Sequence, residues 1–146
     1  MTSAQQLAER VVRGMMDRDE FSRWLGVQVL EVAPGRATTR MTIRQEMVNG
    51  FGVSHGGIVY SLADSALAFA ANTNGNVTLA IENSIGYPQP VHVGDEITAK
   101  AEEESFGNRV GYYRVTCRNQ ADVVVATFRG TVYKTNKAHD SVSSRA

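Results

Sequence analysis

One carboxylate stands alone in the most apolar part of the sequence. Asp64 is the only charged side chain from Gly56 through Ile81. Burying an unpaired carboxylate is unfavourable, so a folded protein keeps one there only with hydrogen bonds, a partner or a shifted pKa. Because perturbed carboxylates cluster at functional sites, Asp64 is a candidate catalytic residue. The alternative is a structural aspartate that bonds Ser61, Ser65 or a distant arginine.

The segment Ser54-His55-Gly56-Gly57 directly precedes a predicted helix. A helix N-terminus presents free N–H groups and a partial positive charge, and glycines let a ligand approach the backbone closely. Such a terminus can hold a phosphate or polarise a carbonyl whose oxygen gains charge during a reaction. The alternative is that the glycines only form a tight turn. His55 could act as a general base, as a positioning donor or as a loop residue bonded to the backbone.

The spacing of these two features constrains how they could work together. Gly56 and Asp64 are eight residues apart, which corresponds to roughly 12 Å along a helix at ~1.5 Å per residue. Within one chain they cannot both touch the same reacting carbon. A two-fold dimer with the helices side by side would bring Asp64 of one chain near Gly56 of the other.

Few other residues combine into a reactive site. Asn49 could donate or accept a hydrogen bond, although asparagine before glycine is typical of turns. Cys117 is the single cysteine, which excludes an internal disulfide and a cysteine-based zinc cluster, and its alternating strand indicates packing. His92 and His139 lie far from the other candidates, so we expect no metal site. The sequence contains no Walker pattern, dinucleotide fingerprint or nucleophile elbow.

The composition limits the class of protein. The chain has 146 residues, 42% of them apolar, which suits one domain with its own core. Fifteen basic and fifteen acidic residues give no net charge, which disfavours a general nucleic-acid binder. No apolar window is long enough to span a membrane, and charges throughout the N-terminal segment disfavour a secretory signal. We therefore expect a cytoplasmic protein that binds neither nucleic acid nor a membrane.

Hydrophobic periodicity predicts two helices and a run of strands. An N-terminal helix is assigned to residues 1–20, with apolar spacing from Gln5 to Phe21. A second helix over 58–74, apolar on nearly all sides, should be buried. One long helix against one antiparallel sheet is an α+β arrangement, and an exposed sheet edge favours an oligomer. The expected strands are 27–33, 36–44, 77–87, 96–106, 109–119 and 123–134, followed by a flexible polar tail over 136–146.

The motifs together resemble a known family. Asn49-Gly50 is followed after five residues by Gly56-Gly57, with His55 before the glycines and Ser61-Leu62-Ala63-Asp64 on the next helix. This combination is similar to the hotdog-fold acyl-CoA thioesterases, in particular the phenylacetyl-CoA thioesterase (PaaI-like) branch of phenylacetate degradation. The similarity extends from Phe21 to about Tyr133. Its weaker strand motifs are Tyr87-Pro88-Gln89-Pro90, Val93-Gly94-Asp95 and Phe128-Arg129-Gly130.

The resemblance implies a long central helix wrapped by a curved antiparallel sheet, in a catalytic homodimer that commonly pairs into a homotetramer. The active site would lie at the dimer interface, with Asp64 as general base or nucleophile. The Gly56 N–H, helped by Gly57, would polarise the thioester carbonyl, and Asn49 and His55 would position the water or the thioester. Relatives carry an assisting Ser or Thr on the strand after the helix. The alignment puts Ala80 in that place, with Ser84 or Asn83 as substitutes.

The resemblance also implies the substrate and the absence of other cofactors. We expect hydrolysis of a medium-chain or aromatic acyl-CoA, with coenzyme A as part of the substrate and no metal. Candidate liners of the acyl tunnel are Phe51, Tyr60, Leu67 and Phe69. Candidate phosphate contacts are Arg109 and Lys134, and the alternative for each is an ordinary solvated charge. The alternatives are a non-catalytic hotdog acyl-CoA sensor and a hotdog dehydratase or hydratase. Asp64 argues against a mere binding module, and the motif fits the dehydratases less well.

Overall fold

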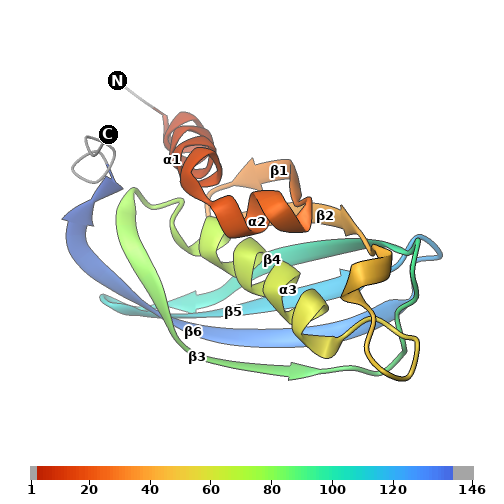
Figure 1. The fold of residues 1–146 in the computed structure, drawn as a ribbon. Coiled ribbons are helices and arrows are strands. Elements are labelled where there is room, and N and C mark those ends of the chain that lie inside the picture. The colour runs from red at the N-terminus through yellow and green to blue at the C-terminus, as the bar shows by residue number, and fades with distance from the viewer. Residues whose placement is uncertain (1–2, 140–146) are drawn as a thin grey trace.

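The computed structural model describes residues 3–139 and shows one antiparallel sheet that curves around a long helix (Figure 1). Two shorter helices lie on the side of this long helix that faces away from the sheet (Figure 1). The helices are α1 (Ala4–Arg18), α2 (Glu20–Leu25) and α3 (Gly56–Ala71), with a 3-10 turn, η1, at Gln45–Met47. The strands are β1 (Gln28–Ala33), β2 (Arg36–Thr42), β3 (Asn76–Gly86), β4 (Glu96–Phe106), β5 (Val110–Arg118) and β6 (Val124–Ala138).

The six strands pair in the order β1-β2-β4-β5-β6-β3, so β1 and β3 are the two edges of the sheet. All five pairings are antiparallel. Register shifts interrupt the ladders between Glu103 and Ser105 and between Ala80 and Glu82. Because an extra residue bends a strand and increases its twist, these irregularities help the sheet to wrap around α3.

The core lies between α3 and the inner face of the sheet. Along α3, leucine and phenylalanine side chains such as Leu62 and Phe69 alternate with alanines, and most of them are fully buried. Alternating residues of the central strands face them, including Ile97, Val115 and Phe128. The prediction of a buried helix against one antiparallel sheet is therefore confirmed, and Tyr60 and Asp64 are among the partly exposed residues of α3.

The single N-terminal helix predicted from periodicity is two helices. The Asp19 side chain accepts a hydrogen bond from the Ser22 N–H (2.9 Å) and thereby caps α2, while Asp19 itself leaves the helical conformation. Gly26 then ends α2 with a positive φ of 88°. Periodicity could not show the break because the apolar residues keep their spacing across it. This cap places α2 directly over α3.

Two other boundaries also differ from the prediction. α3 begins at Gly56 rather than Ile58, because the His55 side chain caps it. β6 continues through Ala138, three residues into the segment predicted as a flexible tail, because it pairs with β3 as far as Asn76. The remainder of the predicted tail, residues 140–146, lies outside the described residues.

Gly130 of β6 offers a test of how tightly α3 sits on the sheet. A Cβ at this position would lie 2.4 Å from Leu67 Cδ2 and 2.8 Å from Asn83 Oδ1. We expect Gly130→Ala to lower the free energy of unfolding by about 1–3 kcal/mol, the usual cost of overpacking, as measured by urea denaturation. Gly107→Ala is the matched control, since its Cβ would make only an ordinary contact with the Val110 carbonyl at 3.6 Å. Equal stability of the two variants would contradict this packing argument.

Candidate active site

Asp64 projects from the middle of α3 toward the edge strand β3. Its Oδ1 accepts a hydrogen bond from the Asn83 amide nitrogen at 3.2 Å, and the same nitrogen donates to the Tyr60 hydroxyl at 3.1 Å. Tyr60 lies one helical turn before Asp64, so the two side chains share a face of α3. Among residues 3–139, no hydrogen-bond partner is found for the other carboxylate oxygen, Oδ2. One oxygen is thus held by the protein and one remains available.

The structural alternative for Asp64 does not match its surroundings. Ser61 donates instead to the Gly57 carbonyl at 2.7 Å, and Ser65 bonds the Ser22 hydroxyl at 2.8 Å. Within residues 3–139, no arginine or lysine forms an ion pair with Asp64. The carboxylate is therefore held by one amide rather than neutralised by a cation.

Burial is the largest influence on the pKa of Asp64 and raises it above the ordinary aspartate value. The hydrogen bond from Asn83 favours the ionised form and partly offsets that rise in pKa, whereas the nearby charge of Asp19 adds to it. A poorly solvated carboxylate is a stronger base than one in water. The environment of Asp64 thus suits a general base or a nucleophile.

The N-terminus of α3 presents one free backbone donor. His55 Nδ1 accepts from the Gly57 N–H (2.9 Å), and the His55 carbonyl accepts from the Ile58 N–H (3.0 Å). The Gly56 N–H has no acceptor among residues 3–139. Because the free N–H stands at the positive end of the helix, it can bind an oxygen that gains negative charge.

Tyr87 from the end of β3 covers this N-terminus. Its hydroxyl donates to the Gly56 carbonyl at 2.8 Å, and a Cβ on Gly56 would lie 3.2 Å from the tyrosine ring. A cavity of about 300 Å³ opens beside them and is lined also by Val59 and Pro90. The described residues around this cavity include no carboxylate. A base that acts there must come from elsewhere.

The hydrogen bond to His55 fixes the tautomer of its neutral ring. Because Nδ1 accepts a hydrogen bond from the Gly57 N–H, the neutral ring carries its proton on Nε2. The exposed Nε2–H can donate to a ligand, whereas Nδ1 is occupied by the helix cap. Of the two functional roles predicted for His55, this arrangement favours the positioning donor over the general base.

The loop before α3 holds Asn49 and Phe51. Asn49 Oδ1 accepts from the Phe51 N–H at 2.9 Å, and the Asn49 backbone bonds both Gly52 and Val53. The side-chain oxygen therefore shapes the loop, as expected of a turn asparagine, and the amide nitrogen remains available. The Phe51 side chain is 93% exposed, so within one protomer it lines no pocket.

The other predicted residues are more scattered. Leu67 and Phe69 are enclosed in the core rather than placed along an open tunnel. Ser84 is exposed on β3 opposite Arg129, and thus lies on the outer face of the sheet, away from Asp64. Tyr60 packs edge-to-face against Phe128 and bonds Asn83, which brings it into the site.

The two predicted phosphate contacts lie at the other end of α3 from Gly56. Arg109 donates to the Lys134 carbonyl and to Asn136, and the Lys134 ammonium lies 5.5 Å from the Phe106 ring centroid. Lys134 pairs with Thr78, which bonds Asn72 at the C-terminal end of α3. Within one chain, neither side chain approaches Gly56.

Two residues of the site were poorly anticipated. The sequence indicates Asn83 only as a substitute for a missing Ser or Thr, and nothing in it points to Tyr87 as a cover for Gly56. Cys117 is buried, and burial raises the pKa of its thiol to about 12, which agrees with the predicted packing role.

Among the described residues, no three His, Cys, Asp or Glu side chains gather as metal ligands. No helix in that part of the chain is long and apolar enough to cross a membrane.

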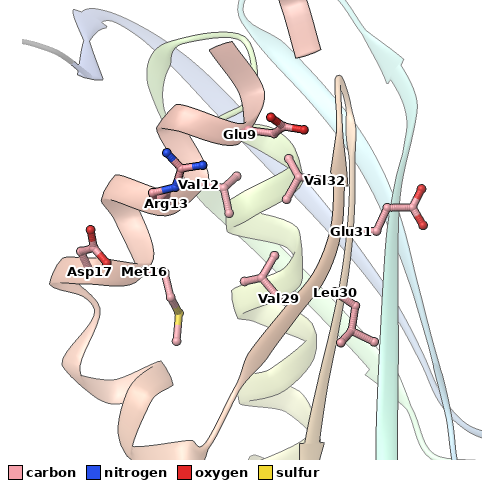
Figure 2. Close-up of a pocket in the computed structure, with 9 residues that line it drawn as sticks. All are labelled: Glu9, Val12, Arg13, Met16, Asp17, Val29, Leu30, Glu31 and Val32. Atoms are coloured by element: carbon pink, nitrogen blue, oxygen red, sulfur yellow. The ribbon is translucent and has the colours of Figure 1, made fainter. Parts of the chain in front are cut away.

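A larger hollow of about 420 Å³ lies between α1 and β1 (Figure 2). Val12, Met16 and Val29 form its apolar part, and charged side chains such as Glu9 and Arg13 stand at its rim (Figure 2). None of the predicted site residues contributes to it. The candidate residues Gly56 and Asp64 lie instead on α3.

A family model described as the thioesterase superfamily matches residues 51–126, the segment that contains both Gly56 and Asp64. The chain belongs to the thioesterase superfamily. The structure of the Escherichia coli PaaI protein from the phenylacetic acid degradation operon superposes with a TM-score of 0.91 at 32% identity, covering 93% of this chain and 99% of that one. This superposition confirms the hotdog fold and the predicted PaaI-like membership.

Two curated relatives support the same family assignment. The chain is 34% identical over 120 residues to the acyl-coenzyme A thioesterase PaaI of Escherichia coli, which covers 82% of this chain and 86% of the relative. It is 38% identical over 132 residues to a putative esterase of Archaeoglobus fulgidus, covering 90% and 86% of the two chains. The match extends well beyond the motif around α3.

The desolvated charge of Asp64 should cost stability. Because the pKa is higher in the folded than in the unfolded state, native stability falls as the pH rises from the ordinary aspartate pKa through the raised one, and the loss is complete above it. We expect Asp64→Asn to increase the free energy of unfolding by about 0.5–2 kcal/mol at neutral pH, a typical gain when a strained functional residue is replaced. Urea denaturation as a function of pH measures this.

The same measurement distinguishes burial from a general charge effect. The gain should shrink as the pH falls through the raised pKa of Asp64, since protonation then neutralises the wild-type side chain as well. The exposed Asp17→Asn is the control and should change stability little at any pH. A loss of stability in Asp64→Asn at neutral pH would show that the carboxylate is structural.

Proposed function

We propose that this protein hydrolyses the thioester of a medium-chain or aromatic acyl-CoA to the free acid and CoA. The observation that carries this proposal is the half-buried, raised-pKa carboxylate of Asp64 on the same helix as the free Gly56 N–H. In a chain of the thioesterase superfamily, this pair supplies a base and an oxyanion donor. The acyl-coenzyme A thioesterase PaaI of Escherichia coli, at 34% identity, supports acyl-CoA as the substrate class.

The proposed reaction needs only these two groups. The Gly56 N–H binds the carbonyl oxygen, and Asp64 takes a proton from a water that attacks the carbonyl carbon. The tetrahedral intermediate collapses, the C–S bond breaks, and the CoA thiolate leaves and recovers the proton from Asp64. In the alternative, Asp64 attacks the carbon itself, the C–S bond breaks and the CoA thiolate leaves. Water then hydrolyses the resulting mixed anhydride to the free acid and restores the Asp64 carboxylate, and a released proton converts the thiolate to the thiol.

The distance between the two groups requires a second subunit. Gly56 and Asp64 lie roughly 12 Å apart on one rigid helix, and the cavity beside Gly56 has no carboxylate of its own chain among its described residues. Tyr60 lies midway between them in sequence. Two antiparallel α3 helices that meet about a two-fold axis near Tyr60 would place the partner subunit's Asp64 opposite Gly56.

The exposed edge of the sheet supports this dimer. β3 is an edge strand of eleven residues, and Leu79 and Ile81 on it are 56% and 60% exposed. An uncovered edge with apolar side chains is prone to pair with another chain. Phe51, on the loop before α3, would be covered in the same assembly and would reach the partner's acyl pocket. Association of two such dimers into a tetramer stays a prediction.

A panel of acyl-CoA thioesters tests the activity. We expect thiol release from phenylacetyl-, hydroxyphenylacetyl- or medium-chain acyl-CoA, and a loss of about 10³-fold or more in kcat for Asp64→Asn, because its amide cannot accept the proton of water. Gly56→Pro removes the N–H at the first helical position, where proline is tolerated, and should cost about 10²–10³-fold in kcat.

Gly56→Ala is the matched control for the proline variant. Both substitutions introduce a Cβ against Tyr87, but only proline deletes the donor, so alanine should retain far more activity. Wild type that hydrolyses no member of the panel would favour the sensor or dehydratase interpretation. Full activity of Asp64→Asn would exclude the mechanism while leaving the activity in place.

Mixed dimers test where the two groups meet. In a heterodimer of Asp64→Asn with Gly56→Pro, a shared interface leaves one of the two sites intact, so activity should reappear on co-expression. The two inactive homodimers, mixed without subunit exchange, are the control. If both groups of a site came from one chain, each site would carry one defect and the heterodimer would stay inactive.

A further inference from the structure

Asn83 of β3 connects two side chains of α3. Its amide nitrogen donates to Asp64 Oδ1 at 3.2 Å and to the Tyr60 hydroxyl at 3.1 Å. An amide NH₂ has two hydrogens, so both donors are in use. The Tyr60 ring is itself held by its edge-to-face contact with Phe128. Through Asn83, β3 thus holds the Asp64 carboxylate. The hydrogen bond to Tyr60 holds the Asn83 amide itself in place.

The opposite end of the same amide has no partner. Asn83 Oδ1 is buried and accepts no hydrogen bond from any of residues 3–139. It lies against Gly130, where an added Cβ would be only 2.8 Å away. Turning the amide over would give the oxygen a partner in the Tyr60 hydroxyl, but it would place that oxygen against an ionised carboxylate. The observed orientation therefore leaves an acceptor unpaired in order to give Asp64 a donor.

We propose that Asn83 is a positioning residue for the reaction: its amide, anchored by Tyr60, holds Asp64 Oδ1 and directs Oδ2 toward the reacting atoms. This inference rests on the proposed function for its catalytic consequence, whereas the contact itself can be measured separately. A carboxylate fixed through one oxygen loses rotational freedom, and the other oxygen keeps its lone pairs for water or the thioester.

The groups around Asp64 differ in whether they favour its ionised or its protonated form. Asp19, at the N-cap of α2, disfavours the ionised form, as does burial, and Tyr60 on α3 is the titratable neighbour on its own face. On β3, the Asn83 amide is the group that favours the ionised form. Its removal should therefore raise the pKa of Asp64 further.

Asn83→Ala tests the proposal through activity and titration together. We expect kcat to fall about 10- to 100-fold, as is common when a reacting group is misplaced, with little change in KM. The acid limb of the kcat–pH profile should move to higher pH. Tyr60→Phe, which keeps the ring but frees the amide, should show the same changes to a smaller extent and guards against misfolding of the alanine variant.

A carboxyl ¹³C NMR titration of the protein labelled at aspartate reads the contact without any substrate, with the Asp64 signal assigned by Asp64→Asn. Asn108→Ala, in the exposed β4–β5 turn, is the control and should leave both readouts unchanged. An Asp64 titration that is the same in Asn83→Ala and wild type would overturn the proposal, even if activity fell. If the wild type hydrolyses no acyl-CoA, the proposed function fails, and a shifted titration would still establish that Asn83 holds Asp64.

Discussion

The rest of the site depends on a carboxylate kept partly out of water in the middle of α3. An arginine beside Asp64 would have stabilised the buried charge, but it would also have lowered the pKa of the carboxylate and made it a weaker base. The chain instead supplies one neutral donor from Asn83 and leaves Oδ2 without a partner among the described residues. Burial and the Asp19 charge keep the pKa of Asp64 raised, while the Asn83 amide stabilises the ionised form and partly offsets that rise. A site of this kind favours reactivity over stability.

The same helix determines the geometry of the proposed reaction. α3 is one continuous helix around which the sheet curves, so the distance from Gly56 to Asp64 cannot adapt to a substrate. His55 and Tyr87 fix the N-terminal end through the Gly57 N–H and the Gly56 carbonyl, and Asn83 fixes the middle. In the proposed dimer the two ends act on one thioester only across the two-fold axis. The exposed edge of β3 and the exposed Phe51 would then serve catalysis as well as assembly.

Sequence reasoning succeeded where the signal is local and failed where it depends on register. Periodicity predicted α3 and the strands, and the isolation of Asp64 in an apolar segment predicted a carboxylate with a perturbed pKa. The break at Asp19 was missed, because one capping side chain interrupts a helix without changing its apolar spacing. The contact between Asp64 and Asn83 was also missed as a contact, since it joins residues nineteen positions apart on different elements. Sequence spacing does not show which face of a strand meets a helix.

The register shift in β3 determines which of its side chains face α3. Thr78 and Ala80 pair with Lys134 and Val132 before the register shift, and regular alternation would turn Glu82 and Ser84 toward α3 as well. The shift between Ala80 and Glu82 reverses the alternation.

After the shift, Asn83 lies opposite the buried Gly130, and Ser84 lies opposite the exposed Arg129. If the same sequence continued in the register of Ala80 and Val132, Glu82 would lie opposite Gly130, and its carboxylate would face Asp64 in the space that the amide now fills. A one-residue register shift on an edge strand therefore places the Asn83 amide beside Asp64. The size of the neighbouring glycine then leaves room for the amide oxygen that finds no partner.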